Sequence, residues 1–378
     1  MNIDRPAKKK ELKIAFLSAG LGNISRGFEI STSTWYKHIQ GQEYISARLY
    51  SGGPHQGAVR VWNCSRNGKI AGFLRYIKLI HDGCRLEQLT FGFTAFFHLL
   101  IYKPDLIWVQ EATLAASLLK YRKVFRLKYK LMFCDGAPVG HAFASKFDYQ
   151  IFLHQYALED AMNSGIHKER CAVIPYICTE PNSSLEKGDS RRILNIANEQ
   201  FVVLCVAAWN IYHKRIDYLL NEVAKTGSKE ILLLLCGQAE KETGYLKTLA
   251  INLDINVRWH TFSQDDLQSA YRAADLFVLP SLTEGLGAVL IEAGLNGLPI
   301  ICHHHNAAKY ILGEDYPGLT DLSGAGNLAR QIILYKQEPA CMAHGINMRE
   351  TIERRFGSKK LKEDFLNFIK QTSIGKSA

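Results

Sequence analysis

The sequence lacks a long apolar run. Its most apolar stretch, 91–102, is twelve residues long and contains a histidine, whereas a helix that spans a bilayer needs about 20 apolar residues. The cationic run 8–10 imitates the start of a secretory signal, but the apolar segment 14–17 behind it is shorter than the usual minimum of about seven. We therefore expect a cytoplasmic chain without a transmembrane segment.

Paired cysteines are also missing. The chain has nine cysteines, an odd number, and no Cys-x-x-Cys pair, which argues for reduced thiols rather than a disulfide framework. Cys205 and Cys236 fall in apolar stretches, where a thiol serves as a small core residue. Residues 303–305 are consecutive histidines, and neighbouring side chains on an extended segment point in opposite directions, so no zinc site is predicted there.

The net positive charge is confined to the first half of the chain. Residues 1–180 hold 24 Lys and Arg against 14 Asp and Glu, whereas 181–378 hold 22 of each. No zinc-finger, RNA-recognition or helix-turn-helix signature accompanies this charge, so nucleic-acid binding is not predicted. Within 118–130, cations alternate with aromatic and aliphatic residues. This pattern is typical either of a helix on an anionic membrane surface or of a solvated basic face, and both interpretations stay open.

Length and hydropathy favour two α/β domains. A chain of 378 residues corresponds to about two domains of ~150 residues, and 47% hydrophobic residues are enough for two cores. Short apolar runs alternate with amphipathic stretches, which indicates parallel sheets covered by helices. In the second half, strands are expected at 201–208, 230–236, 257–262, 276–280 and 299–302, and helices at 215–226, 241–253, 265–273, 286–296 and 325–335. In the first half, strands are expected at 12–19, 106–110, 131–134, 149–153 and 171–175, followed by a polar linker at 176–192.

The most apolar part of the second half contains two carboxylates. Glu284 follows the strand 276–280, and Glu292 lies one to two turns inside the next helix. A lone glutamate here would be interpreted as a helix cap or part of a polar rim. A pair is different, because carboxylates are seldom buried without partners. Gly285 and Gly287 let a ligand approach the backbone where a helix N-terminus favours an anion. These residues predict a ligand with a diphosphate and sugar hydroxyls.

A family resemblance rests on these residues. Glu284 and Glu292 match the Glu-x7-Glu motif of family 4 glycosyltransferases, and 209–214 is similar to that family's Arg-x4-Lys segment. The resemblance implies the GT-B fold, two Rossmann-like domains facing across a cleft, and sugar transfer from a nucleotide diphosphate donor with retention of configuration. It also implies that the first glutamate contacts the donor sugar and the second holds the ribose diol. The diphosphate is then expected at the amides of Gly285, Leu286 and Gly287.

Lys214 stands at the lysine of the second motif. An ammonium group at this position balances the charge that builds on the departing diphosphate. The family's arginine is Trp209 in this chain, so either Arg215 or a residue of the other domain supplies that charge, or turnover is slower. Alone, Lys214 would be interpreted as a solvated lysine at a helix start. Beside the two glutamates it is interpreted as catalytic, with Trp209 and Arg215 in the donor site.

The resemblance extends the site to further loops. Gly22 and Arg26, which follow the first strand, are expected to face the donor diphosphate. Asp135 could accept the proton of the acceptor hydroxyl or simply belong to an Asp-Gly turn, and the two interpretations are even. His260 and Phe262 are assigned to the donor site. Because family members often have glycine where His260 stands, the donor base is left open.

The predicted organisation is an acceptor-side domain at 1–178, a nucleotide-sugar domain at 193–340, and helices at 341–378 that return to the first domain. Catalysis is expected at Lys214, Glu284 and Asp135. No Asp-x-Asp pair is present, so no metal and no other cofactor are predicted. The partners are a nucleotide sugar, a hydroxyl acceptor that is a glycan, a lipid-linked molecule or another compound, and an anionic membrane at 118–130. The alternatives are a nucleotide-sugar epimerase and a catalytically silent scaffold.

Overall fold

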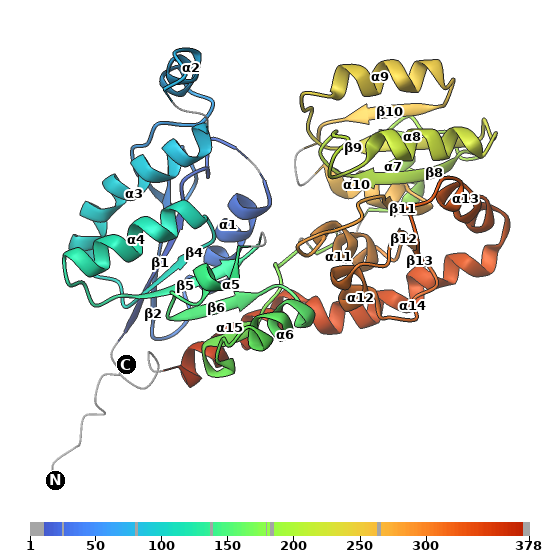
Figure 1. The fold of residues 1–378 in the computed structure, drawn as a ribbon. Helices are drawn as coiled ribbons and strands as arrows, with labels where there is room; N and C mark the ends of the chain where they lie inside the picture. The colour runs from blue at the N-terminus through green and yellow to red at the C-terminus, as the bar shows by residue number, and fades with distance from the viewer. Residues whose placement is uncertain are drawn as a thin grey trace, which may run out of the picture. The chain divides into compact units, whose positions relative to one another are not determined.

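The computed structural model describes residues 11–24, 26–79, 82–136, 139–178, 180–181, 185–262 and 266–372. The chain forms two compact units, one of Met1–Ile177 with Ser358–Ala378 and one of Cys178–Gly357. Each unit contains one parallel sheet with helices on both faces (Figure 1). The α/β class with two Rossmann-like sheets is therefore confirmed.

The first unit has a sheet of seven strands in the order β3-β2-β1-β4-β5-β6-β7. The order reverses between β1 and β4, and ligands of such sheets bind at the strand carboxyl ends beside that reversal. All pairs are parallel, with Phe16 of β1 opposite Trp108 of β4. The strands are β1 (Leu12–Ser18), β2 (Ile45–Ser51), β3 (Ala58–Arg60), β4 (Leu106–Val109), β5 (Lys130–Asp135), β6 (Tyr149–Phe152) and β7 (Cys171–Val173).

Helices bury both faces of this sheet. On one face, α3 (Gly83–Tyr102) and α4 (Ala112–Val124) pack on β1, β4 and β5. On the other, α1 (Gly27–Ile39) and α15 (Ser358–Gln371) meet at an aromatic contact, where the Phe365 ring lies 5.2 Å from Trp35 and 5.5 Å from Trp108. Burial on both faces explains why these strands are continuously apolar. The remaining helices are α2 (Lys69–Tyr76), α5 (His141–Ala144) and α6 (Gln155–Asn163).

The second unit has a six-stranded parallel sheet in the order β10-β9-β8-β11-β12-β13. Its order reverses between β8 and β11, so the loops after these two strands meet at the predicted binding edge. The strands are β8 (Phe201–Val206), β9 (Ile231–Cys236), β10 (Val257–His260), β11 (Leu276–Leu279), β12 (Ile300–His303) and β13 (Leu319–Thr320).

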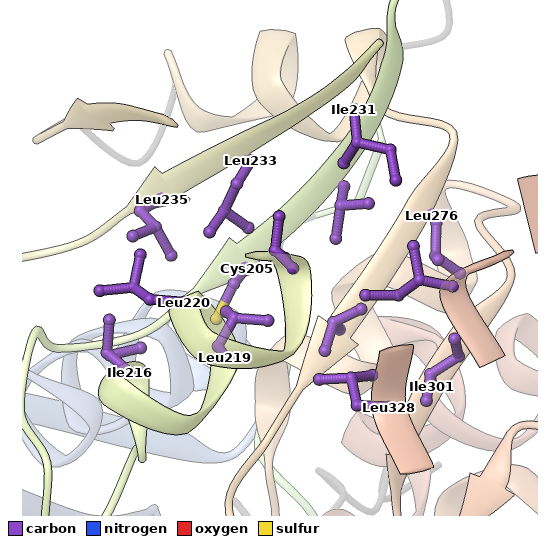
Figure 2. Close-up of a cluster of buried hydrophobic side chains, with 14 of the residues drawn as sticks. Cys205, Ile216, Leu219, Leu220, Ile231, Leu233, Leu235, Leu276, Ile301 and Leu328 are labelled. Carbon is purple, nitrogen blue, oxygen red and sulfur yellow. The ribbon is translucent and has the colours of Figure 1, made fainter. Parts of the chain in front are cut away.

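The core of the second unit lies between its sheet and α8 (Ile216–Lys225), α9 (Thr243–Asn252) and α13 (Asn327–Gln337). Figure 2 shows Leu219 and Leu220 of α8 meeting Leu233 and Leu235 of β9, with Cys205 among them. All nine cysteines are free thiols. The other face carries α7 (Lys187–Ile193), α10 (Leu267–Ala273), α11 (Ala288–Leu295) and α12 (Asn306–Leu312).

Two expectations about element boundaries differ from the structure. The predicted linker 176–192 contains most of α7, which packs on α10 rather than connecting two domains freely. Its Arg191 is buried because the guanidinium bonds Asp275 at 2.6 Å and the Ala273 carbonyl at 3.1 Å. The strand β2 and the short strands β3 and β13 were not predicted. The first residue of the helix expected at 265–273 lies outside the described residues.

The C-terminal helices are divided between the units. The sequence predicts that residues 341–378 pack together on the first domain, whereas α14 (Pro339–Phe356) packs on α11 and α12 of the second unit and α15 belongs to the first. Small residues allow this docking. Gly345 of α14 faces the backbone of Gly297, Leu298 and Pro299, and Ile352 reaches Gly294 of α11.

Replacing Gly345 with alanine tests this packing. A Cβ atom at this position would collide with the backbone at 297–299, so Gly345→Ala should lower the free energy of unfolding by about 1–3 kcal/mol. Gly244→Ala in α9 is the matched control, because a Cβ there meets open space and should stabilise the helix by about 0.5 kcal/mol. Urea denaturation measures both. Equal stability of the two variants would contradict the docking of α14 described above.

Candidate functional site

The carboxyl ends of β8 and β11 bring Lys214 and Glu284 into contact. The Lys214 ammonium donates a hydrogen bond to Glu284 Oε1. Only 17% of the lysine side chain and 7% of the glutamate side chain are exposed. These residues are 70 positions apart in the sequence and meet because their strands are neighbours in the sheet. The pair occupies the edge where ligands of this fold bind.

The β8–α8 loop is held by its own polar groups. The Asn210 side-chain oxygen accepts hydrogen bonds from the backbone N–H groups of Lys214 at 2.8 Å and His213 at 3.2 Å. Arg215 adopts a left-handed conformation, φ 49°, at the start of α8. Its guanidinium donates to the carbonyls of Pro280 at 3.2 Å and Leu322 at 2.7 Å. Arg215 therefore links the β8–α8 loop to the segments that contain Pro280 and Leu322, and its charge faces their backbone oxygens.

His213 is a site residue that the sequence analysis missed. Its Nε2 atom lies 3.7 Å from Glu284 Oε2 and 3.3 Å from the Thr283 carbonyl oxygen. The side chain is partly exposed, so it can meet a ligand. Its position directly before the motif lysine was the available signal. Two basic side chains, Lys214 and His213, thus contact the same carboxylate.

The segment after Glu284 turns into α11 at a glycine. Gly287 adopts φ 77°, which favours glycine, and Leu286 is buried while Gly285 is exposed. None of the described side chains caps the N-terminus of α11. The first amide groups of that helix, together with its dipole, therefore suit a bound anion.

Glu292 lies inside α11 and is partly buried. Burial raises the pKa of its carboxyl above the usual value, and a hydrogen bond from the Tyr271 hydroxyl at 2.7 Å acts in the opposite direction. The same surroundings raise the pKa of Tyr271 well above its usual value, chiefly through burial. Glu292 thus has a fixed partner on α10 and keeps oxygen atoms available as acceptors.

Trp209, predicted as a donor-binding residue, lies in the hydrophobic core. Its backbone N–H donates to the Gln238 carbonyl at 3.0 Å, and its indole ring packs edge-on against Trp259 at 5.0 Å. The Lys247 ammonium lies 5.8 Å from the ring. Only 5% of Trp209 is exposed. An indole fills volume at the position of the family's arginine and brings no charge there.

His260, the last residue of β10, and Phe262, which follows that strand, form a stacked pair. Their rings are 5.0 Å apart and nearly parallel, with an interplanar angle of 4°. The His260 carbonyl accepts a hydrogen bond from the Gly237 N–H at 2.9 Å, which ties the pair to the end of β9. Burial, assisted by the Arg258 charge, lowers the pKa of His260, so the ring is neutral at physiological pH.

In the first unit, Gly22 and Arg26 lie between β1 and α1. Gly22 adopts φ 84°, and a Cβ atom there would meet the backbone of Gly53 and Pro54. This close approach of two loops accounts for the glycine. Arg26 occupies the N-cap position of α1 and is exposed. The predicted roles of both residues toward the diphosphate stay predictions.

Asp135 ends β5 and lies close to a buried tyrosine. Burial raises the pKa of Tyr176 well above its usual value, and the charges of Cys134 and Asp135 add to this effect. Gly136 follows in tight contact with the Tyr176 hydroxyl and the Phe28 ring. The rest of the predicted turn, residues 137 and 138, lies outside the described residues.

Glu111 is a second residue that the sequence analysis missed. It follows β4, the neighbour of β1, and its buried carboxylate accepts hydrogen bonds from Ser18 Oγ at 3.2 Å, Ala19 N at 3.0 Å and Gly20 N at 3.4 Å. Burial raises its pKa to about 7, and these bonds oppose the rise. The charged side chain directly after the expected strand 106–110 could have identified Glu111 from the sequence. The Glu111 carboxylate accepts hydrogen bonds from the backbone N–H groups of Ala19 and Gly20 at the start of this loop. These two groups are therefore not available to a phosphate.

Two further buried glutamates, Glu29 and Glu87, share Arg66 as a cationic neighbour. Arg66 bonds Glu87 through Nε at 2.6 Å and lies 3.9 Å from Glu29. Burial raises the pKa of Glu29. A Cβ atom at Gly20 would collide with the Glu29 carboxylate, so the loop packs directly on this cluster. The β1–α1 loop is therefore held by the carboxylate of Glu111, which follows β4, and packs on Glu29 of α1.

A cavity of about 360 Å³ opens beside this loop. It combines an exposed indole, a guanidinium, two amide side chains and a hydroxyl, which together suit a sugar or an anionic headgroup. The Asn63 amide anchors one wall by donating to the Ala19 carbonyl at 2.8 Å. The lining residues are Asn23, Gly52, Arg60, Trp62, Asn63 and Ser65.

Neither a metal-binding group nor a membrane-spanning helix is found among the described residues. Within the part of the chain that the structure describes, no three His, Cys, Asp or Glu side chains are grouped to hold a metal ion. Among the same residues, no helix combines the length and apolarity that a membrane crossing requires.

Known proteins resemble this chain in sequence and fold. Residues 186–352 match the family Glycosyl transferases group 1. The alpha-galactosylglucosyldiacylglycerol synthase of Streptococcus pneumoniae is 24% identical over 247 residues, which cover 62% of this chain and 64% of that protein. The match thus spans somewhat less than two thirds of that relative's length.

Solved structures match over almost the whole chain. Sucrose-phosphate synthase from Thermosynechococcus elongatus has a TM-score of 0.79 at 16% identity, covering 97% of this chain and 100% of that chain. The Anabaena protein HepE, solved in complex with UDP and glucose, has a TM-score of 0.75 at 17% identity, covering 96% and 100%. These likenesses show the fold.

The fold and the site in the second unit define a GT-B protein. Residues 186–352, which lie in the second unit, match the group 1 glycosyltransferases, also known as family 4, whose members retain anomeric configuration. The predicted resemblance to this family and the predicted fold are confirmed.

The raised pKa of Glu111 predicts a pH dependence of stability. Between pH ~4.5 and ~7 the folded protein holds a proton on this carboxyl and the unfolded chain does not, so stabilisation is complete below this range and is lost as the pH rises through it. Glu111→Gln cannot titrate. The stability of the wild type relative to this variant should therefore fall by up to about 3 kcal/mol from the lower to the upper pH. Urea unfolding at several pH values measures the difference, and parallel curves would contradict it.

Proposed function

We propose that this protein is a retaining glycosyltransferase that moves a hexose-type sugar from a nucleotide diphosphate sugar to a hydroxyl acceptor. The observation that carries the proposal is the contact between Lys214 and Glu284 at the switch point of the second sheet, directly before the uncapped N-terminus of α11. This edge of the sheet brings together a cation, helix amides and a carboxylate. A diphosphate joined to a sugar needs those three groups.

Each group then has a role in binding the donor. The amides of Gly285, Leu286 and Gly287 and the Lys214 ammonium bind the diphosphate. Glu284 accepts hydrogen bonds from the sugar hydroxyls, and Glu292 accepts them from the ribose. UDP-hexoses are the first donors to test, because the structural relative HepE was solved with UDP and glucose.

Donor binding then rearranges the ion pair between Lys214 and Glu284. Without donor, Lys214 and Glu284 satisfy each other. A bound diphosphate attracts the ammonium and thereby frees Glu284 for the sugar hydroxyls. The ammonium then stabilises the charge that develops on the leaving diphosphate. Trp209 contributes no charge to this step, so His213 is the second basic group that we assign beside the leaving group.

The acceptor is proposed to use the first unit. Asp135 is proposed to orient the acceptor hydroxyl or accept its proton. Arg60 and Trp62 line the cavity beside the β1–α1 loop and suit an anionic or glycosylated headgroup. The Streptococcus relative is named as a synthase of a glycolipid, which supports a lipid or lipid-linked acceptor. The basic segment 118–130 is proposed to contact an anionic membrane.

Transfer is proposed to need neither a metal ion nor another cofactor. The charge on the diphosphate is balanced by Lys214 and the N-terminus of α11, and His213 lies beside them as a hydrogen-bonding group. Activity should therefore persist after exhaustive treatment with EDTA, and a metal requirement restored by Mg²⁺ or Mn²⁺ would contradict this part of the proposal.

Substitution of Glu284 tests the transfer reaction. Glu284→Gln keeps the size of the side chain but removes its charge, so kcat/KM with the preferred donor should fall at least about 100-fold. Glu230→Gln is the matched control, because Glu230 also pairs with a lysine, Lys336 at 2.6 Å, but is exposed. Release of nucleoside diphosphate from UDP-, GDP-, ADP- and dTDP-sugars with an extract of lipid acceptors provides the measurement.

The same assay separates the alternatives. Conversion of the donor sugar without an acceptor would identify an epimerase. No turnover of any donor, combined with donor binding in a thermal-shift assay, would identify a silent scaffold. Equal activity of Glu284→Gln and the Glu230→Gln control would remove the proposed role of the ion pair.

Substitution of Glu292 tests the ribose contact. If its carboxylate accepts a hydrogen bond from the 2′-hydroxyl, the wild type should bind UDP about ten times more tightly than 2′-deoxy-UDP, and Glu292→Gln should lose most of this preference. Because burial raises the pKa of Glu292, the preference should weaken with falling pH before an ordinary carboxyl would protonate. Calorimetric titration measures both. An unchanged preference in the variant would place the ribose elsewhere.

A further inference from the structure

Helix α3 is largely apolar, including most of its exposed side chains, although it lies on the surface of the first unit. Its inner face, with Phe91, Ala95 and Leu99, belongs to the core cluster on β1, β4 and β5. A helix that is hydrophobic all round is normally covered on every side. The 20 residues of α3 include only two charged ones, Arg85 and Glu87. We therefore expect another molecule to cover the outer face of α3.

The outer face of α3 forms a continuous apolar ridge. Leu89, Phe93, Phe97 and Ile101 are four residues apart and thus lie on one side of the helix. Their exposed fractions are 42%, 57%, 51% and 82%. The Phe93 and Phe97 rings contact each other at 5.4 Å, so the ridge is a packed surface rather than a set of isolated side chains. We call these four residues the apolar ridge.

Aromatic contacts join the apolar ridge to the basic end of α4. Phe96 packs on Phe97 at 5.3 Å and on Phe125 at 4.7 Å. Phe125 is itself more than half exposed and caps the C-terminus of α4. Exposed cations surround it in the sequence and form what we call the cationic rim: Lys120, Lys123, Arg126 and Lys128.

The charge around this surface has one sign. Residues 69–79 hold three Lys or Arg, 83–102 one and 112–130 six, and the same ranges contain a single acidic residue, Glu87. Glu87 is buried and bonded to Arg66. Most exposed side chains around the apolar ridge are therefore cationic or apolar; the exposed exceptions include Asp82 at the N-cap of α3 and His98. An anionic lipid surface complements both properties, because it attracts the cations and accepts the apolar side chains.

The cavity beside the β1–α1 loop adjoins the apolar ridge. Thr94, next to Phe93 on α3, donates a hydrogen bond to the carbonyl of Trp62 at 2.5 Å, and Trp62 lines the cavity. A polar cavity beside an apolar surface matches a molecule with a polar head and a lipid tail. Such a molecule is embedded in a membrane.

We propose that the apolar ridge and the cationic rim are the surface by which this protein docks on an anionic membrane. The ridge side chains enter the boundary between headgroups and acyl chains, and the rim lies at the lipid phosphates. The ridge carries the apolar part of the contact and 118–130 only the electrostatic part. This inference concerns docking alone and does not rest on the transfer reaction.

Vesicle co-sedimentation of the full chain, without nucleotide sugar, tests the proposal. The wild type should partition onto vesicles of phosphatidylcholine with phosphatidylglycerol, and less onto phosphatidylcholine alone or at high salt. Phe93→Ser/Ile101→Ser should lower the partition coefficient for anionic vesicles at least about tenfold. Lys123→Glu/Arg126→Glu should lower it at least about tenfold as well, and only at low salt.

Ile251→Ser is the matched control. Ile251 lies on α9 of the second unit and is 77% exposed, close to the 82% of Ile101, but it lies outside the ridge. This variant should bind vesicles like the wild type. The melting temperatures should be similar in all variants, because the replaced side chains face solvent. Glu284→Gln should also bind vesicles normally, which separates docking from transfer.

Three results would overturn the proposal. The wild type could fail to bind vesicles of either composition. The ridge variant and the Ile251→Ser control could bind equally well. Finally, the wild type could self-associate in sedimentation velocity and become monomeric in the ridge variant, while vesicle binding stays unchanged. That last result would assign the apolar ridge to contacts between copies of the chain.

Discussion

A largely buried contact between one ammonium and one carboxylate organises the candidate site. Lys214 and Glu284 come from loops 70 residues apart and share a position where few water molecules reach them. A charge removed from water needs a partner, and removal of either partner leaves the other uncompensated. The loops after β8 and β11 are thereby held together before any ligand arrives. Arg215 supports the same loops from beneath through the carbonyls of Pro280 and Leu322.

In both units, two adjacent loops are joined at the carboxyl edge of the sheet, but by different contacts. In both sheets the strand order reverses beside the first strand, which leaves two loops adjacent at the carboxyl edge. The second unit joins these loops by an ion pair. The first joins them by the carboxylate of Glu111, which accepts backbone hydrogen bonds from Ala19 and Gly20. The amides at the start of the β1–α1 loop are therefore occupied by the protein, whereas the N-terminus of α11 is left for an anion.

The surface of the first unit follows from α3. Its inner residues build the core, and its outer residues, Phe93, Phe97 and Ile101, remain in contact with water. The same unit carries all of the chain's excess charge, while the second unit supplies the motif glutamates. The predicted donor-binding residues and the exposed apolar face of α3 thus lie in different units.

The strands at the centre of both sheets could be predicted from sequence, because short apolar runs bounded by turn residues, such as 276–280, are typical of buried strands. Glu284 and Glu292 were predicted as site residues from their spacing around Gly285 and Gly287, and Lys214 from its place after the strand 201–208. The folded structure, by contrast, shows that Lys214 and Glu284 touch, that Trp209 is buried, and that α14 and α15 belong to different units. It also revealed His213 and Glu111 as contacts of the candidate loops. These properties depend on strand order and on packing between distant segments, which no local pattern of residues encodes.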